Sequence, residues 1–130
     1  MIALDTNVLV RFLVCDDEPQ AASARTLLAS FSAENPGFVC REVVLELVWG
    51  LERAYGFPRE EIADILEQLV STEELVVEAA ADVARAAFRY GTGEAGFSDL
   101  MILAAAERSH ALPVYTFDQK AARVEGVRLL

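Results

Sequence analysis

Four acidic residues stand at positions where α/β proteins commonly carry out chemistry. Asp5 and Asp118 each directly follow a short apolar run that is expected to form a buried strand. Ligand sites in open α/β sheets lie beyond the carboxyl ends of the strands, so both carboxylates are expected at that edge. Asp99 opens an expected helix after a glycine-rich loop, and Glu46 lies inside an apolar helical stretch. Acids recurring at such places indicate a shared acidic site.

Some of these acids also have a purely structural explanation. Asp5 or Thr6 could cap the helix that follows the first strand, which is a common role for both residue types. Glu46 could face solvent, because Glu42, Glu46 and Arg53 can share one face of their helix. A carboxylate among apolar residues is costly to bury unless something pairs with it. The recurrence of acids at matching places favours a site over these alternatives.

Carboxylates brought close together repel one another, and at least one is expected to protonate unless a cation neutralises the cluster. Mg²⁺ or Mn²⁺ suits this task, because both take oxygen ligands and keep several waters that a phosphate substrate can displace. Such an ion can orient water and stabilise charge on a phosphodiester. The residues by themselves therefore indicate an acid-rich α/β domain that could be metal-dependent.

The elements that must position these acids alternate along the chain. Strands alternating with helices, without hairpin signals, are typical of a parallel α/β sheet. Apolar residues at helical spacing predict buried stripes on the helices at 41–54 and 79–90. Proline and acids open the helix that begins near residue 58. The remaining predicted helices are 8–14, 20–32, 99–109 with Ser98 as its N-cap, and 119–123, and the predicted strands are 2–4, 38–40, 75–77, 113–116 and 127–129.

Length and composition indicate one globular domain spanning residues 1–130. Hydrophobic residues make up 54% of the chain, which argues against disorder. No apolar run approaches the roughly 20 residues of a membrane span, and the N-terminus lacks the features of a signal peptide. Cys15 and Cys40 are expected to be reduced and buried. We therefore expect a cytoplasmic protein.

The charge balance is acidic. The chain has 21 acidic and 11 basic residues, which gives a formal net charge of -10. Such a protein is poorly suited to hold nucleic acid through phosphate contacts alone. An acidic surface, a basic partner protein or a cluster of acids that binds cations fits the balance better.

Other motifs in the sequence have simpler explanations than a binding or catalytic site. Residues 91–96 fit the pattern G-x-G-x-x-G, but the dinucleotide fingerprint needs a strand directly before it, and residues 79–90 are predicted to be helical. The loop is instead interpreted as a flexible segment that positions Asp99. His110, the only histidine, is interpreted as a helix C-terminal cap. Four aromatic residues are expected in the core: Phe12, Phe31, Trp49 and Phe88.

Four segments together resemble a known family. They are residues 4–10 (LDTNVLV), 45–51 (LELVWGL), 97–102 (FSDLMI) and 116–122 (TFDQKAA). In order and spacing they resemble the PIN-domain ribonucleases, and most of all the VapC-type toxins of bacterial and archaeal toxin–antitoxin pairs. The resemblance covers nearly the whole chain. It implies a PIN-like three-layer α/β fold, with a mostly parallel central sheet of four or five strands flanked by helices.

The resemblance also implies an activity: endonucleolytic hydrolysis of RNA by water activated by Mg²⁺ or Mn²⁺, leaving a 5′-phosphate and a 3′-hydroxyl. The family's acidic residues correspond to Asp5, Glu46, Asp99 and Asp118, of which Asp5 and Asp99 would be the firmest metal ligands. A cognate antitoxin and a homodimer are the implied protein partners. The supporting residues implied are the polar Asn7 and Thr116, with Arg11 and Lys120 as phosphate contacts.

Two other functions remain open. A PIN-fold binding module without turnover, held by a protein partner through its acidic surface, would suit the net charge of -10. A receiver-like signalling domain would need an acidic pair at one strand end. The residue next to Asp5 is Thr6, and Glu46 is expected on a helix, so the receiver hypothesis fits less well.

Overall fold

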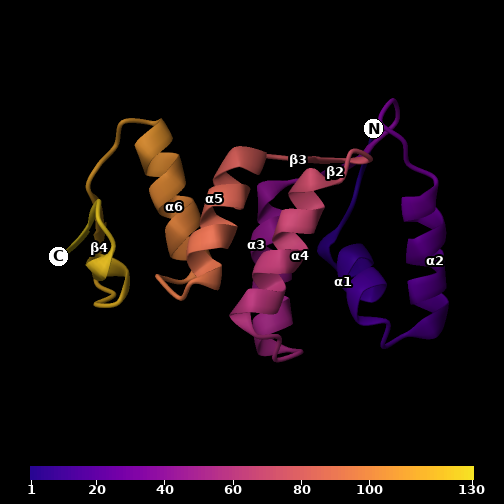
Figure 1. Cartoon of the computed structure of the whole chain (residues 1–130), viewed down its shortest axis with the longest axis horizontal. Helices are drawn as coiled ribbons and strands as arrows, with labels where there is room; N and C mark the ends of the chain where they lie inside the picture. The colour runs from indigo at the N-terminus through magenta and orange to yellow at the C-terminus, as the bar shows by residue number, and fades with distance from the viewer. The chain divides into compact units, whose positions relative to one another are not determined.

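The computed structural model describes residues 1–130 and divides into two compact units, each described here by itself. The first unit contains Met1–Phe57 and Gln68–Ala80, and the second contains Pro58–Glu67 and Ala81–Leu130. The elements are labelled in Figure 1. One domain over residues 1–130 therefore stays a prediction.

The first unit is built on a parallel three-stranded sheet. Its order is β1 (Ile2–Ala3), β2 (Gly37–Val39) and β3 (Leu75–Val77), with Ile2 opposite Gly37 and Gly37 opposite Leu75. A side chain could not replace the hydrogen of Gly37, because its Cβ would lie 2.6 Å from the ring of Phe31. The glycine therefore allows β2 to pass directly over a buried aromatic ring.

The ends of the helices in the first unit are set by local features of the sequence. Asp17 accepts a hydrogen bond from Gln20 N at 3.1 Å and so caps the second helix, whose first turn contains Pro19, as its sequence predicts. Cys15 ends the first helix in the left-handed conformation, with φ at 59°. The helices are α1 (Thr6–Val14), α2 (Glu18–Ala29) and α3 (Arg41–Arg53), together with the last residues of α4 (Arg59–Ser71).

The second unit joins helices to a parallel pair of strands. Its helices are α5 (Ala80–Gly91) and α6 (Phe97–Arg108), together with the first residues of α4. Strands β4 (Val114–Thr116) and β5 (Val127–Leu129) pair in parallel, with Val114 opposite Val127. A short 3₁₀ helix, Ala121–Arg123, lies between them, where the sequence predicted a helix over 119–123. Within each of the two sheets the strands are thus parallel, and the predicted α/β class is confirmed.

The predicted helical stripes form the core. The stripe of α3 is buried along its whole length, at Val43, Val44, Leu47, Val48 and Leu51, and so are Val83, Ala86, Ala87 and Tyr90 of α5. Burial of each valine or leucine side chain contributes about 1.5–3 kcal/mol. Periodicity therefore predicted correctly which face of each helix is buried.

Three of the four aromatic residues expected in the core are exposed instead. Phe31 is buried, but Phe12 is 40%, Trp49 64% and Phe88 74% exposed. Trp49 and Phe88 lie on the faces of α3 and α5 opposite the buried stripes, where their size cannot bring them into the core. Both cysteines are free as expected, but Cys15 is exposed and Cys40 only partly buried, so their expected burial was wrong.

Arginine–carboxylate pairs are numerous on this acidic chain. Five arginines form ion pairs with acids of the same unit: Arg11–Asp16, Arg25–Glu18, Arg85–Glu107, Arg89–Glu94 and Arg108–Asp82. Four of these pairs are largely exposed and contribute little to stability. The fifth differs, because Asp82 is a buried charged residue, only 8% exposed.

The Asp82–Arg108 pair should respond unequally to removal of its two partners. Arg108 donates from Nη2 at 2.6 Å and from Nε at 3.2 Å, both to Asp82 Oδ2. Arg108→Ala leaves a buried carboxylate without its cation and should cost about 3 kcal/mol. Asp82→Ala leaves an arginine that water can solvate, so it should cost less. Urea unfolding of the two variants measures the difference, and equal losses would contradict this account.

Candidate active site

Asp5 is placed by the start of α1. It is the N-cap residue, in extended conformation, and its Oδ1 accepts a hydrogen bond from Thr6 N at 2.7 Å. A capping carboxylate usually accepts from the second or third residue of the helix, as Asp17 does from Gln20. Asp5 is therefore a cap by position, but its bond reaches only the next residue. Its side chain is exposed, and its Oδ2 makes no hydrogen bond.

Glu46 is tied to the start of α1 across the first unit. Thr6 Oγ1 donates a hydrogen bond to Glu46 Oε2 at 3.0 Å, which links α1 with α3. Glu46 is exposed, so the solvent-facing alternative describes its position correctly. Because Thr6 follows Asp5 directly, the same bond keeps the carboxylate of Glu46 near the end of β1.

Asp99 lies in the first turn of α6, in the second unit. The helix begins at Phe97 with Gly96 as its N-cap, so the prediction that Ser98 caps it was wrong. Gly96 has the extended backbone, with ψ at 150°, that marks the boundary two residues earlier than predicted. Partial burial, and secondly the negative charge of Asp118, raise the pKa of Asp99 above its ordinary value.

Asp118 is held rigidly after β4. Its backbone N–H donates to Thr116 Oγ1 at 3.0 Å, and its Oδ1 accepts from Lys120 N at 2.8 Å and Ala121 N at 3.1 Å. These bonds leave Oδ2 without a hydrogen-bond donor. Asp99 and Asp118 thus form a pair of carboxylates close enough to repel each other, which is the situation that a cation relieves.

Arg59, which was not among the predicted site residues, holds the loop before Asp99. Its Nη1 donates to the carbonyl oxygens of Tyr90 at 3.1 Å and Ala95 at 2.7 Å. Its guanidinium lies 4.5 Å from the centre of the Tyr90 ring, which meets the Phe97 ring edge-on. Arg59 therefore joins the end of α5 to the start of α6. A positive charge is unfavourable in the first turn of a helix, and this was the one sequence signal that could have found it.

The glycine-rich loop itself follows a helix, as predicted. Residues 80–91 form α5, so the loop lacks the preceding strand that dinucleotide binding requires. Arg89 closes the loop through two hydrogen bonds to Glu94, at 2.9 and 2.6 Å. His110 follows the end of α6 in the left-handed conformation and donates its backbone N–H to Glu107 O. The C-cap of α6 is Ser109, so His110 is the residue after the cap and its predicted role as the cap was wrong.

Gly96 is close enough to Asp99 for an added methyl group to matter. A Cβ at Gly96 would lie 3.1 Å from Asp99 Oδ2. Gly96→Ala should therefore displace the carboxylate and lower the affinity for Mn²⁺ about tenfold, the lower end of what changes beside a metal ligand cost. Calorimetric titration measures this. Gly50→Ala is the control, because nothing lies within 4 Å of its Cβ, and unchanged affinity in the Gly96 variant would show that Asp99 is not a ligand.

The predicted supporting residues differ in whether other side chains of the protein already bind them. Arg11 is engaged by its own unit, since Nε donates to Gln20 Oε1 at 2.6 Å and Nη1 to Asp16 Oδ1 at 2.7 Å. Asn7 is exposed and, with Arg11 and Gln20, lines a cavity of about 410 Å³ between α1 and α2. The side chain of Lys120 is exposed. Lys120 is therefore freer than Arg11 to meet a phosphate.

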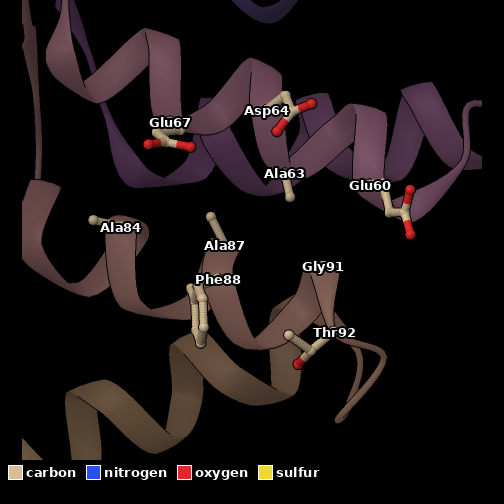
Figure 2. Close-up of a pocket in the computed structure, with 9 residues that line it drawn as sticks. All are labelled: Glu60, Ala63, Asp64, Glu67, Ala84, Ala87, Phe88, Gly91 and Thr92. Carbon is tan, nitrogen blue, oxygen red and sulfur yellow. The ribbon is translucent and has the colours of Figure 1, made fainter.

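A second cavity lies away from all four acids. It has a volume of about 480 Å³ and lies between α4 and α5. Figure 2 shows Glu60, Asp64 and Glu67 on α4 and Phe88 on α5, with Thr92 just beyond the end of α5. None of the predicted site residues lines it.

The structure thus brings the predicted acids into two groups. Glu46 joins the start of α1 beside Asp5 in the first unit, and Asp99 lies near Asp118 in the second. Within either unit, no group of three or more His, Cys, Asp or Glu side chains lies close enough to hold a metal ion by itself. No helix of the structure is long and apolar enough to cross a membrane.

Comparisons with known proteins match the chain to a family. The PIN domain family matches residues 2–127. The chain is 28% identical over 120 residues to the "VapC ribonuclease" of Aquifex aeolicus (strain VF5), covering 92% of this chain and 89% of that protein. No solved structure matches the chain significantly. With nearly its whole length matched, the chain belongs to the PIN domain family.

Proposed function

We propose that this protein is a metal-dependent endoribonuclease and the toxin of a toxin–antitoxin pair. The observation that carries the proposal is the family match over residues 2–127, together with similarity to a VapC ribonuclease along 89% of that relative's length. The four acids lie within the matched residues 2–127. The cytoplasm is the expected location of such an enzyme.

The residues fit a divalent cation. The donor set is made only of oxygens, from Asp5, Glu46, Asp99 and Asp118, as Mg²⁺ and Mn²⁺ prefer. The raised pKa of Asp99 beside Asp118 supports a cation at this pair, because a positive charge would remove the repulsion. When bound, the ion would supply Lewis-acid stabilisation of the phosphodiester and activation of water.

The chain's own residues have separate tasks in this proposal. By the family resemblance, Asp5 and Asp99 would be the firmest ligands, and Glu46 and Asp118 would hold a second ion or its waters. Thr6 fixes the orientation of Glu46 through its 3.0 Å hydrogen bond. Thr116 accepts the backbone N–H of Asp118 and so fixes the start of its loop.

Phosphate binding falls to the remaining polar and basic residues. Lys120, and less directly Arg11, neutralise the phosphates that flank the cut, while Asn7 supports the substrate beside Asp5. The reaction adds water across the phosphodiester bond and leaves a 5′-phosphate and a 3′-hydroxyl.

The partners follow from the acidic surface and the family. A cognate antitoxin would silence the enzyme by covering the site, with an arginine reaching the carboxylates. The net charge of -10 suits such a basic segment. A homodimer is expected, and a monomer at high concentration in light scattering would contradict it.

Cleavage of labelled RNAs by the purified protein tests the proposal. The reactions contain Mg²⁺, Mn²⁺ or EDTA, with an Asp5→Asn variant beside the parent protein. Cutting that needs metal and is lost in the variant is the expected result. If neither cutting nor calorimetric metal binding is found, the chain is a PIN-fold binding module held by a partner, and the nuclease proposal is wrong.

A further inference from the structure

Phe117 is the most exposed large hydrophobic residue described for this chain, at 80%. Single exposed hydrophobic residues are common on protein surfaces, so exposure alone says little. Its position says more, because it lies between Thr116 and Asp118 at the end of β4. An exposed aromatic residue thus directly precedes one of the four acids in the chain.

The backbone on both sides of Phe117 is fixed. Leu130 N donates to Thr116 O at 2.8 Å on one side, and Asp118 N donates to Thr116 Oγ1 at 3.0 Å across the residue itself. On the other side, Asp118 Oδ1 accepts from two backbone N–H groups. The ring is therefore presented by a rigid turn, and little backbone entropy would be lost when a ligand covers it.

We propose that Phe117 stacks on an unpaired nucleobase of the RNA, next to the phosphate that is cut. This inference rests on the proposed function, because the acid beside Phe117 then marks where that phosphate lies. Proteins read single-stranded RNA largely by stacking splayed bases on aromatic side chains. The substrate is accordingly a single-stranded segment, since a base inside a duplex offers no free face.

The charge of the chain explains why stacking is needed. A protein with net charge -10 gains little from phosphate contacts, and Lys120 is the one lysine near Phe117. Stacking does not depend on charge and binds any base. Phe117 therefore supplies affinity that the acidic surface cannot.

Binding of a short labelled oligouridine, followed by fluorescence anisotropy, tests this inference. All variants carry Asp5→Asn, which prevents cutting. Binding of an abasic oligomer of equal length, which has the same backbone but no bases, is measured in parallel. Phe117→Ala should weaken oligouridine binding about tenfold, within the range that loss of one stacked base costs. Phe117→Trp should keep the affinity, and the abasic oligomer should bind both proteins alike.

Phe88→Ala is the matched control, because Phe88 is also a phenylalanine and is 74% exposed, but lies at the α4–α5 cavity. It should bind oligouridine like the parent. In a Trp49→Phe background, the fluorescence of a Phe117→Trp protein should be quenched by oligouridine and not by the abasic oligomer. Equal affinity in the parent and the Phe117→Ala protein, or absence of quenching, would overturn the inference.

The outcomes separate this inference from the proposed function. If the wild-type protein binds oligouridine through Phe117 but cuts no RNA with either metal, the nuclease proposal fails and the stacking site stands. If it cuts RNA and Phe117→Ala neither binds nor cuts differently, stacking fails and the nuclease proposal stands. If Phe117→Ala changes only the oligomeric state, the ring belongs to a protein interface and the inference is wrong.

Discussion

Replacing Asp99 by asparagine should lower the rate of RNA cleavage on the order of a thousandfold, since a catalytic metal supplies several kcal/mol of transition-state stabilisation and each 1.4 kcal/mol is tenfold in rate. The amide keeps the shape of the side chain but loses the charge that attracts the ion. Gel-based cleavage assays with Mg²⁺ measure the loss. Asp64→Asn is the control, because Asp64 is an exposed acid lining the α4–α5 cavity.

The same substitution should make the metal-free protein more stable. Burial and the charge of Asp118 raise the pKa of Asp99, so the ionised form is disfavoured in the folded state. This penalty is absent below the ordinary pKa of aspartate, where Asp99 is protonated in both states. It grows as the pH rises through the raised pKa and is complete above it.

Thermal unfolding in EDTA measures this effect. Asp99→Asn should unfold at a higher temperature than the parent at neutral pH, and the difference should vanish in acid. Addition of Mn²⁺ should stabilise the parent and not the variant. A variant less stable than the parent at neutral pH would show that Asp99 contributes to the fold and not to a cation site.

Arg59→Ala should destabilise the protein by about 3 kcal/mol, because it removes two hydrogen bonds from a charged group and a cation–π contact. Carbonyl oxygens of Tyr90 and Ala95 lose their donor, and the loop that precedes Asp99 is no longer tied to α4. Cleavage should fall at temperatures where the variant is still folded, since Asp99 loses its fixed position. Urea unfolding and cleavage assays at low temperature separate the two losses.

Arg59→Lys and Arg25→Ala make this prediction specific. A lysine can reach one carbonyl but not both in the same geometry, so it should recover part of the stability. Arg25 pairs with Glu18 on the surface, and its removal should change stability little. If the two alanine variants were equally stable, Arg59 would be an ordinary surface arginine.

The regular elements could be predicted from sequence because their signals are local. The strand at 75–77 and the buried stripes of α3 and α5 were predicted as they occur. Periodicity identifies which face of a helix is buried, whatever the size of the side chains on the other face. Trp49 and Phe88 were wrongly expected in the core, because both lie on the helix faces opposite the buried stripes of α3 and α5. The start of α6 was missed because Ser98 resembles a cap, whereas the extended backbone at Gly96 sets the boundary.

The same difference between local and long-range signals applies to the candidate site. Asp5, Asp99 and Asp118 were identified because each follows a strand or opens a helix, and Glu46 because it interrupts an apolar helical stretch, and each of these signals is local in the sequence. The supports of Glu46 and Asp99 were not identified, because each joins distant residues. The Thr6–Glu46 hydrogen bond spans 40 positions, and Arg59 reaches carbonyls 31 and 36 positions away. A hydrogen bond to a backbone carbonyl demands no particular side chain there, so it leaves no pattern in sequence.

The five arginine–carboxylate pairs have a consequence for how binding should vary with ionic strength. With Arg59 also engaged by carbonyls, six of the eleven basic side chains are already satisfied within the protein. Few cations remain to displace the counterions that surround an RNA strand, and each such contact contributes about -0.7 to the slope of log affinity against log salt. This protein should therefore show a shallow slope, and added salt should even speed its first encounter with RNA by screening the repulsion between two polyanions.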